Sequence, residues 1–134
     1  MSLKEKVEKN LKAAELLESE GLYNASCNRF YYHVYQKFLH LNQEYLGYSY
    51  DKERGSSHVA LTNYYKSKMH NYAFSNFKER ARVNDLPSTL NAIKKYREIA
   101  DYEEDDISAK DINSLRKKVA RFNELHNIVL KNLK

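Results

Sequence analysis

Glycine and proline, the residues that most often interrupt helices, are scarce in this sequence. Its 134 residues include 3 glycines and 1 proline. Apolar residues recur at helical spacing along most of the chain. The length matches one ordinary domain, and no repeat, low-complexity tract or long linker divides it. We therefore predict a single all-α domain over residues 1–134.

Two helices are predicted in the first third of the chain. Ser2 and Glu5 have the spacing of a capping box, so a helix is expected over residues 3–19, ended by Gly21. A second helix is expected over 23–46. One face of it carries Tyr23, Cys27, Phe30, Tyr31, Val34, Phe38 and Leu41, and a second stripe beside that face carries Asn28, Tyr32, Tyr35 and Leu39. So broad an apolar surface is typical of burial by neighbouring helices or by a second subunit, and we predict a homodimer.

Three further helices are predicted after a loop over residues 47–57. Ser56 or Ser57 caps the third helix, which continues through Leu61, Tyr65 and Tyr72. The stretch up to residue 84 is ambiguous, and Pro87 suits the first turn of a fourth helix. Ser108, followed by Asp111, opens a fifth. The pattern predicts a five-helix, mostly antiparallel up-and-down bundle.

Charge is distributed in blocks along the chain. The formal net charge is +5, and the counts of Lys and Arg minus Asp and Glu are +5 for residues 57–100, −5 for 101–107 and +5 for 108–134. Two basic stretches around an acidic run are able to attract a polyanion such as RNA. On charge alone, solvated helix faces are the simpler interpretation.

Several common classes of site have no signature here. We find no metal-ligand spacing, phosphate-cradling glycine loop or nucleophile elbow, and we expect neither a metal nor a cofactor. Cys27 is the single cysteine and is expected in the core. The acidic cluster of Glu103, Glu104, Asp105 and Asp106 is contiguous, which favours a charge effect near the fifth helix over a cation site. Without a signal peptide or a membrane-spanning stretch in the sequence, we expect a cytoplasmic protein.

Three segments in order resemble a known superfamily. They are LLESEGLYNASCNRFYYHVY over 16–35, SSHVAL over 56–61 and KKYREIADYEEDD over 94–106, followed by a long amphipathic helix. The pattern covers nearly the whole chain and is similar to an uncharacterised family of HEPN-type domains with an R-x-x-A-D-Y motif. The resemblance implies a helical bundle that often dimerises, and a role beside a nucleotidyltransferase or as a metal-independent ribonuclease in toxin–antitoxin and defence systems.

HEPN ribonucleases carry an arginine followed, after four to six residues, by a histidine. The arginine holds phosphate and the histidine moves the proton of the ribose 2′-hydroxyl. Arg97 stands at the matching position here, but residues 102–104 are Tyr, Glu and Glu, so the histidine is missing. Arg97, Asp101 and Tyr102 remain the candidate catalytic residues. An ion pair between Arg97 and Asp101, with Tyr102 packed at the helix end, is the structural alternative.

Other candidates surround this motif. Asn28, Arg29, Tyr32 and His58 are candidate ligand-binding residues in the same cleft as Arg97, with packing and capping roles as the alternative. Arg121 and His126 have the ribonuclease spacing but stand on the last helix, and chance alone explains that match. Since His126 also falls on the apolar stripe of that helix, we predict a core histidine.

Three functions are compatible with the sequence. The first is a nucleotide- or RNA-associated HEPN binding module that acts with a nucleotidyltransferase or a defence or toxin–antitoxin partner and is not a catalyst. The second is a metal-independent HEPN ribonuclease toxin that uses Arg97. The third is a helical dimerisation scaffold with no nucleic-acid role.

Overall fold

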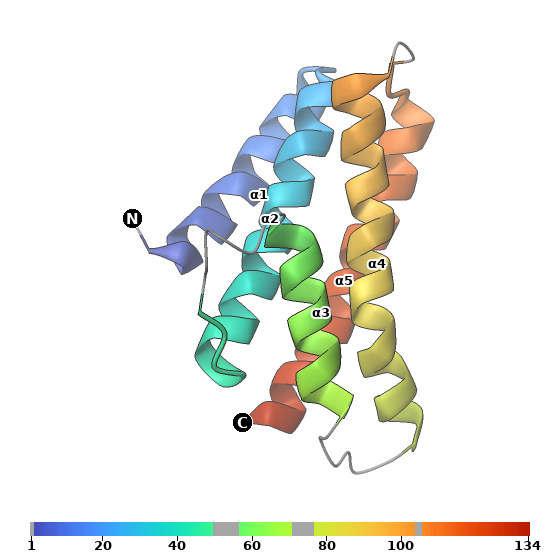
Figure 1. Cartoon of the computed structure of the whole chain (residues 1–134). Coiled ribbons are helices and arrows are strands. Elements are labelled where there is room, and N and C mark those ends of the chain that lie inside the picture. Colours follow the sequence, from blue (N-terminus) through green and yellow to red (C-terminus); the bar gives the residue numbers. More distant parts are fainter. Residues whose placement is uncertain (1, 50–56, 71–76, 104–105) are drawn as a thin grey trace.

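The described part of the chain forms a bundle of five helices. The computed structural model describes residues 2–49, 57–70, 77–103 and 106–134, and within them there is no strand. The helices are α1 (Leu3–Ser19), α2 (Tyr23–Tyr45), α3 (Ser57–His70), α4 (Phe77–Tyr102) and α5 (Ala109–Leu133). In Figure 1, α1 and α4 run in one direction while α2, α3 and α5 run in the other. The predicted all-α, mostly antiparallel bundle is confirmed, and α2 with α3 forms a parallel pair within it.

A glycine turn folds α1 back onto α2. Gly21 has a φ of 75°, a conformation that glycine adopts without the steric cost of a Cβ. The Gly21 N–H donates to the carbonyl of Glu18, and the Leu22 N–H donates to that of Leu17, both at 2.9 Å. These two bonds form a Schellman motif, which satisfies carbonyls at the end of α1. The predicted bounds of α1, from the cap at Ser2 to the stop at Gly21, are confirmed.

Helix α2 is the centre of the fold, because it contacts each of the other four helices. Its predicted core face is buried, and Cys27, Val34, Phe38 and Leu41 have no exposed surface. Burial of the Cys27 thiol raises its pKa to about 12, so the thiol stays protonated and behaves as an apolar side chain. The expected core role of this cysteine is confirmed.

The second stripe of α2 is largely covered within the same chain. Tyr32, Tyr35 and Leu39 are half-buried and pack against the core. This packing accounts for much of the apolar surface that led us to expect a second subunit. Helix α2 ends at Tyr45, one residue before the predicted end.

Helix α4 begins ten residues earlier than predicted. We placed Pro87 in its first turn, but α4 starts at Phe77 and Pro87 lies inside it. The prediction failed because a proline normally ends a helix, so the preceding segment gave an ambiguous signal. Helix α3 begins at Ser57 as predicted, whereas Tyr72 and most of the predicted loop lie outside the described residues.

A hydrogen bond from α3 compensates for Pro87 inside α4. A proline has no N–H, so the carbonyl of Val83, four residues earlier, loses its helical donor. The Tyr65 hydroxyl of α3 donates to this carbonyl at 2.9 Å, and Tyr65 is only 1% exposed. The hydroxyls of Ser88 and Thr89 donate to the carbonyl of Asp85, each at 2.9 Å. The proline therefore fixes where α3 packs along α4.

Helix α5 closes the bundle with the predicted capping box. The Asp111 N–H donates to the Ser108 hydroxyl oxygen at 3.1 Å, and the Ser108 N–H donates to the Asp111 carboxylate at 3.0 Å. These bonds hold the pKa of Asp111 below its usual range. The face of α5 toward the core carries Ile112, Leu115, Val119, Phe122, Leu125, His126 and Val129. Among the described helices, none combines the length and hydropathy needed to cross a membrane.

We predict that Tyr65→Phe lowers the free energy of unfolding by about 1–2 kcal/mol, because it leaves the buried Val83 carbonyl without a donor. Urea denaturation measures this change. Pro87→Ala restores a backbone N–H for that carbonyl, so Tyr65→Phe should cost less in that background. Tyr45→Phe, at a position 38% exposed, is the control and should change stability by less than about 0.5 kcal/mol. Equal costs for Tyr65→Phe in both backgrounds would contradict the compensation.

Candidate functional site

Side chains from three helices meet where α2 faces α4. Asn28 and Tyr32 are four residues apart and share one face of α2, and Arg97 and Asp101 have the same spacing on α4. His58, at the start of α3, is joined to them through Tyr31. The structure thus brings together six of the predicted site residues: Asn28, Arg29, Tyr32, His58, Arg97 and Asp101. We call this group the arginine–tyrosine cluster.

Arg97 lies between a carboxylate and two aromatic rings. Its Nε donates to Asp101 Oδ2 at 3.4 Å, as the structural alternative predicts. Its Cζ also lies 5.1 Å from the ring centroid of Tyr31 and 5.6 Å from that of Tyr32. Within the described residues, Asp101 contacts Nε only, so no carboxylate bonds to the two terminal nitrogens. With 20% of its side chain exposed, Arg97 remains accessible.

Arg29 approaches the same tyrosine ring. Its Cζ lies 5.4 Å from the Tyr32 centroid, so two guanidinium groups share this ring. Arg29 donates to Asn28 Oδ1 at 2.7 Å, and the Asn28 amide donates to Asp101 Oδ2 at 3.1 Å. Asn28 therefore connects Arg29 to the carboxylate that also pairs with Arg97.

Two residues of the network were missed by sequence reasoning. Asn10 of α1 accepts a hydrogen bond from Arg29 at 3.2 Å and donates to Gln36 of α2 at 2.7 Å. Both are ordinary polar residues on the sides of their helices, and no motif distinguishes them. Gln36 holds Asn10, and Asn10 binds one terminal nitrogen of Arg29 while Asn28 binds the other, which fixes the orientation of the guanidinium beside Tyr32.

Tyr31 and His58 form the buried part of the site. The Tyr31 hydroxyl and His58 Nδ1 are 2.9 Å apart, and the two rings stack with centroids 6.1 Å apart. Burial, together with the positive charges of Lys94 and Arg97, lowers the pKa of His58 to about 4. Burial raises the pKa of Tyr31, so its hydroxyl stays protonated. When this hydroxyl donates to Nδ1, the neutral imidazole carries its proton on Nε2.

Among the described residues, no hydrogen bond joins Tyr102 to the cluster, and its candidate catalytic role stays a prediction. It is 75% exposed at the end of α4. Five residues of helix separate it from Arg97, a rotation of about 140°, so the two side chains leave α4 in different directions. Tyr31, which sequence reasoning assigned only to the core, lies next to Arg97.

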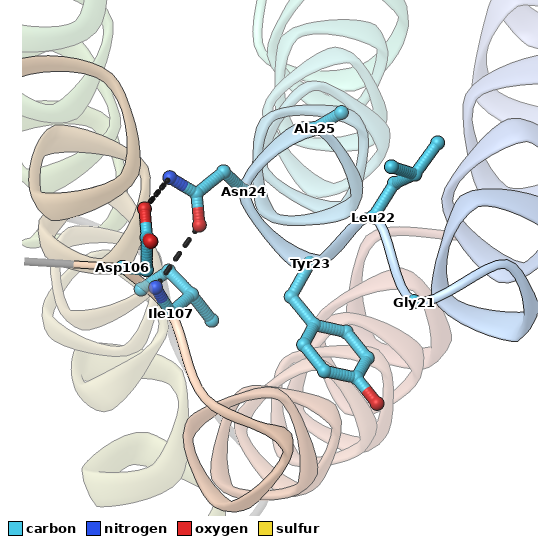
Figure 2. Close-up of a pocket in the computed structure, with 7 residues that line it drawn as sticks. All are labelled: Gly21, Leu22, Tyr23, Asn24, Ala25, Asp106 and Ile107. Carbon is cyan, nitrogen blue, oxygen red and sulfur yellow. Dashed lines mark hydrogen bonds between the residues drawn. The ribbon is translucent and has the colours of Figure 1, made fainter.

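A separate hollow of about 430 Å³ lies at the end of the bundle, by the α1–α2 turn. Figure 2 shows Asn24 reaching from α2 to the segment that leads into α5. Asn24 donates to Asp106 Oδ1 at 3.3 Å and accepts from the Ile107 N–H at 3.0 Å. It also donates to the carbonyl of Ala100 at 3.2 Å. These polar groups bond to one another. Asn24 therefore has a structural role at the hollow, where it holds α2, α4 and the segment before α5 together.

His126 is buried in the core, as predicted. It is 4% exposed and stacks on Phe122 with centroids 5.8 Å apart. Neither ring nitrogen has a hydrogen-bond partner among the described residues. Burial lowers the pKa of His126 to about 3, so the ring is neutral. His126 and Arg121 therefore do not form a site together, because Arg121 is on the exposed side of α5 and pairs with Glu124.

The fold and the site define an all-α bundle with a cationic, tyrosine-rich cluster on one face. No group of three or more His, Cys, Asp or Glu side chains suited to a metal ion occurs in the described part of the chain. The acidic run that precedes α5 lies partly outside the described residues. Comparison with protein-family models, with curated proteins and with solved structures finds no match to this chain.

We predict that the free energy of unfolding falls as the pH is lowered from 6.5 toward 4. Unfolded histidines bind protons near pH 6.5, while the lowered pKa values of His58 and His126 keep both neutral in the fold. Each therefore contributes a slope of up to about 1.4 kcal/mol per pH unit in this window. Urea denaturation at several pH values measures the slope.

Two variants test whether His126 contributes to this pH dependence of stability. His126→Phe keeps an aromatic ring beside Phe122 and removes a titrating group, so the slope below pH 6.5 should decrease. His70→Gln changes an exposed histidine and is the control, which should leave the slope unchanged. A slope unaffected by His126→Phe would contradict the role given to this residue.

Proposed function

We propose that this chain is a HEPN-type binding module for nucleotide or RNA phosphates, acting with a nucleotidyltransferase or another defence or toxin–antitoxin component and not itself a catalyst. The observation that carries the proposal is the approach of Arg29 and Arg97 to the same ring of Tyr32. Guanidinium groups bind phosphate oxygens in a bidentate manner. Two of them beside one tyrosine ring suit a phosphate or phosphodiester.

The local charge balance favours an anion. Arg29, Arg97 and Lys94 supply three positive charges, whereas Asp101 and Glu98 supply two negative ones. Glu98 pairs with Lys94 at 3.7 Å, and Asp101 accepts from Asn28 as well as from Arg97. The carboxylate of Asp101 thus orients Arg97 through Nε, and within the described residues no carboxylate contacts the terminal nitrogens of the guanidinium.

A non-catalytic role follows from the chemistry of the imidazole. The histidine of the ribonuclease signature is missing at residues 102–104. His58 supplies the imidazole of the cluster, but its pKa of about 4 makes it a weak base at neutral pH. Its Nδ1 is also occupied by the Tyr31 hydroxyl.

A ribonuclease remains the second candidate function, and one observation favours it. Tyr31 contacts both Arg97 and His58, so an arginine and an imidazole both approach one buried ring. A bound phosphate that neutralised Arg97 and Lys94 would raise the pKa of His58. The alternative would then use His58 in place of the missing histidine.

Self-association is a further part of the proposal. Leu16 and Leu22 are 62% and 55% exposed, on the last turns of α1 and just beyond it. Exposed leucines so close along the chain suit a contact with another protein surface. The resemblance implies two proteins that would bind this surface. They are a second copy of this chain and the proposed partner protein.

We predict that Arg97→Ala weakens binding of single-stranded RNA or of adenosine 5′-monophosphate by on the order of tenfold or more, because a charge-assisted contact to phosphate is lost. Arg97→Lys should weaken it too, since an ammonium lacks the planar fork. Fluorescence anisotropy with labelled RNA and titration calorimetry with the nucleotide measure affinity.

Arg121→Ala is the matched control for Arg97→Ala. Arg121 also pairs with a carboxylate at 3.4 Å, but it lies on α5 away from the cluster. The control should leave affinity within about twofold of the original chain. Equal losses in both variants would show an effect of overall charge, and no loss in either would remove the proposed site.

We also predict that the purified protein cleaves single-stranded RNA negligibly at neutral pH. Loss of the proton-transfer group from such a site costs roughly a hundredfold to ten-thousandfold in rate. Gel analysis of a labelled RNA over several hours measures cleavage. Cleavage that disappears in both Arg97→Ala and His58→Ala would contradict the non-catalytic proposal and support the ribonuclease.

A further inference from the structure

A polar groove runs between α3 and α4 beside the cluster. It consists of two hollows of about 430 Å³ and 290 Å³. The two share Lys66, Asn84 and Pro87, so they form one continuous channel along the helices. Its ends are marked by His58 and His70, the first and last described side chains of α3. The 14 residues of α3 give the groove a length of roughly 20 Å.

The charge of this groove has one sign. Lys66, Arg80 and Lys94 line it, and among the described lining residues there is no carboxylate. Arg80 donates to the carbonyl of His70 at 3.4 Å, which holds the guanidinium at the far end. Among the described residues, Lys66 has no ion-pair partner. A channel with cations at both ends and in the middle attracts an anionic ligand along its length.

The neutral lining residues add hydrogen-bonding groups. The hydroxyls of Thr62 and Ser88 donate to carbonyls of their own helices. The amides of Asn84 and Asn91 have no hydrogen-bond partner within the described part of the chain, and they lie about 10 Å apart along α4. Val59, 51% exposed, provides an apolar surface near His58.

The groove is continuous with the arginine–tyrosine cluster. His58 lines the groove and also bonds to Tyr31, which contacts Arg97. Lys94 lines the groove one turn before Arg97 on α4. The groove and the cluster therefore share His58, and Lys94 and Arg97 lie on the same helix.

We propose that the α3–α4 groove holds the sugar–phosphate backbone of a single-stranded RNA, one phosphate of which lies at Arg97 and Arg29. This inference rests on the proposed function and extends it from a single phosphate to a strand. Spaced cations suit successive phosphates, and carboxamides pair with base edges or ribose hydroxyls. An acidic peptide carries its charges on flexible side chains, whereas a strand of RNA places one negative charge on each successive backbone unit along the groove.

The test compares two double variants that remove the same charge. Lys66→Gln with Arg80→Gln changes the groove at positions away from the cluster, and Lys117→Gln with Arg121→Gln changes exposed residues of α5. Binding of a labelled single-stranded RNA is followed by fluorescence anisotropy at several salt concentrations. Circular dichroism verifies that each variant is folded.

The groove variant should bind RNA more weakly, and its slope of log affinity against log salt should shrink by about 1.4, the value for two lost phosphate contacts. The α5 variant should keep the slope of the original chain. Adenosine 5′-monophosphate is too short to reach both sites, so its affinity should be unchanged in the groove variant and reduced in Arg97→Ala.

The possible failures are distinguishable. RNA binding that depends on Arg97 but not on Lys66 and Arg80 would overturn the groove and leave the proposed function intact. Binding that depends on neither would overturn both. Displacement of the RNA by a glutamate-rich peptide of equal charge, at equal concentration, would overturn the assignment to RNA and indicate an acidic protein partner.

Discussion

The contacts of Tyr31 join the core of this bundle to its polar face. Its ring is buried among the residues of α2, its hydroxyl meets His58 of α3, and Arg97 of α4 lies over it. One side chain of α2 therefore contacts both α3 and α4. Helix α2 contacts all four other helices, and its residues Asn28 and Arg29 take part in the bonds that position the arginines.

The polar network carries this register across the molecule. Asn10 of α1 and Asn28 of α2 hold Arg29 from two sides, and Asn28 also bonds to Asp101 of α4. Exposed ion pairs contribute little to stability, so the main effect of these bonds is to orient the two arginine side chains. They fix two guanidinium groups against one ring, which reduces the conformational freedom that an anion would otherwise have to remove on binding.

The sequence predicted best the elements whose ends carry their own chemical signal. Ser2, Gly21 and Ser108 mark helix ends through local hydrogen bonds, and these bounds were found. Pro87 misled the prediction because its compensation comes from Tyr65, a residue distant in sequence. The candidate site followed from helical spacing together with a resemblance, which is why Asn28, Arg29 and Arg97 were found. Tyr31 was missed as a site residue because an apolar stripe does not reveal which of its members borders a polar face.

The order of charges along α4 and the segment after it determines where along the chain a polyanion is attracted and where it is repelled. Residues 57–100 carry a net charge of +5, and residues 101–107 carry −5. The cations of the groove and Arg97 fall in the first block, while Asp101 begins the second. A polyanion is attracted along α3 and α4 and repelled past the end of α4. The arginine–tyrosine cluster lies at this boundary, so a phosphate chain in the groove would end there, held by Arg97 and limited by Asp101.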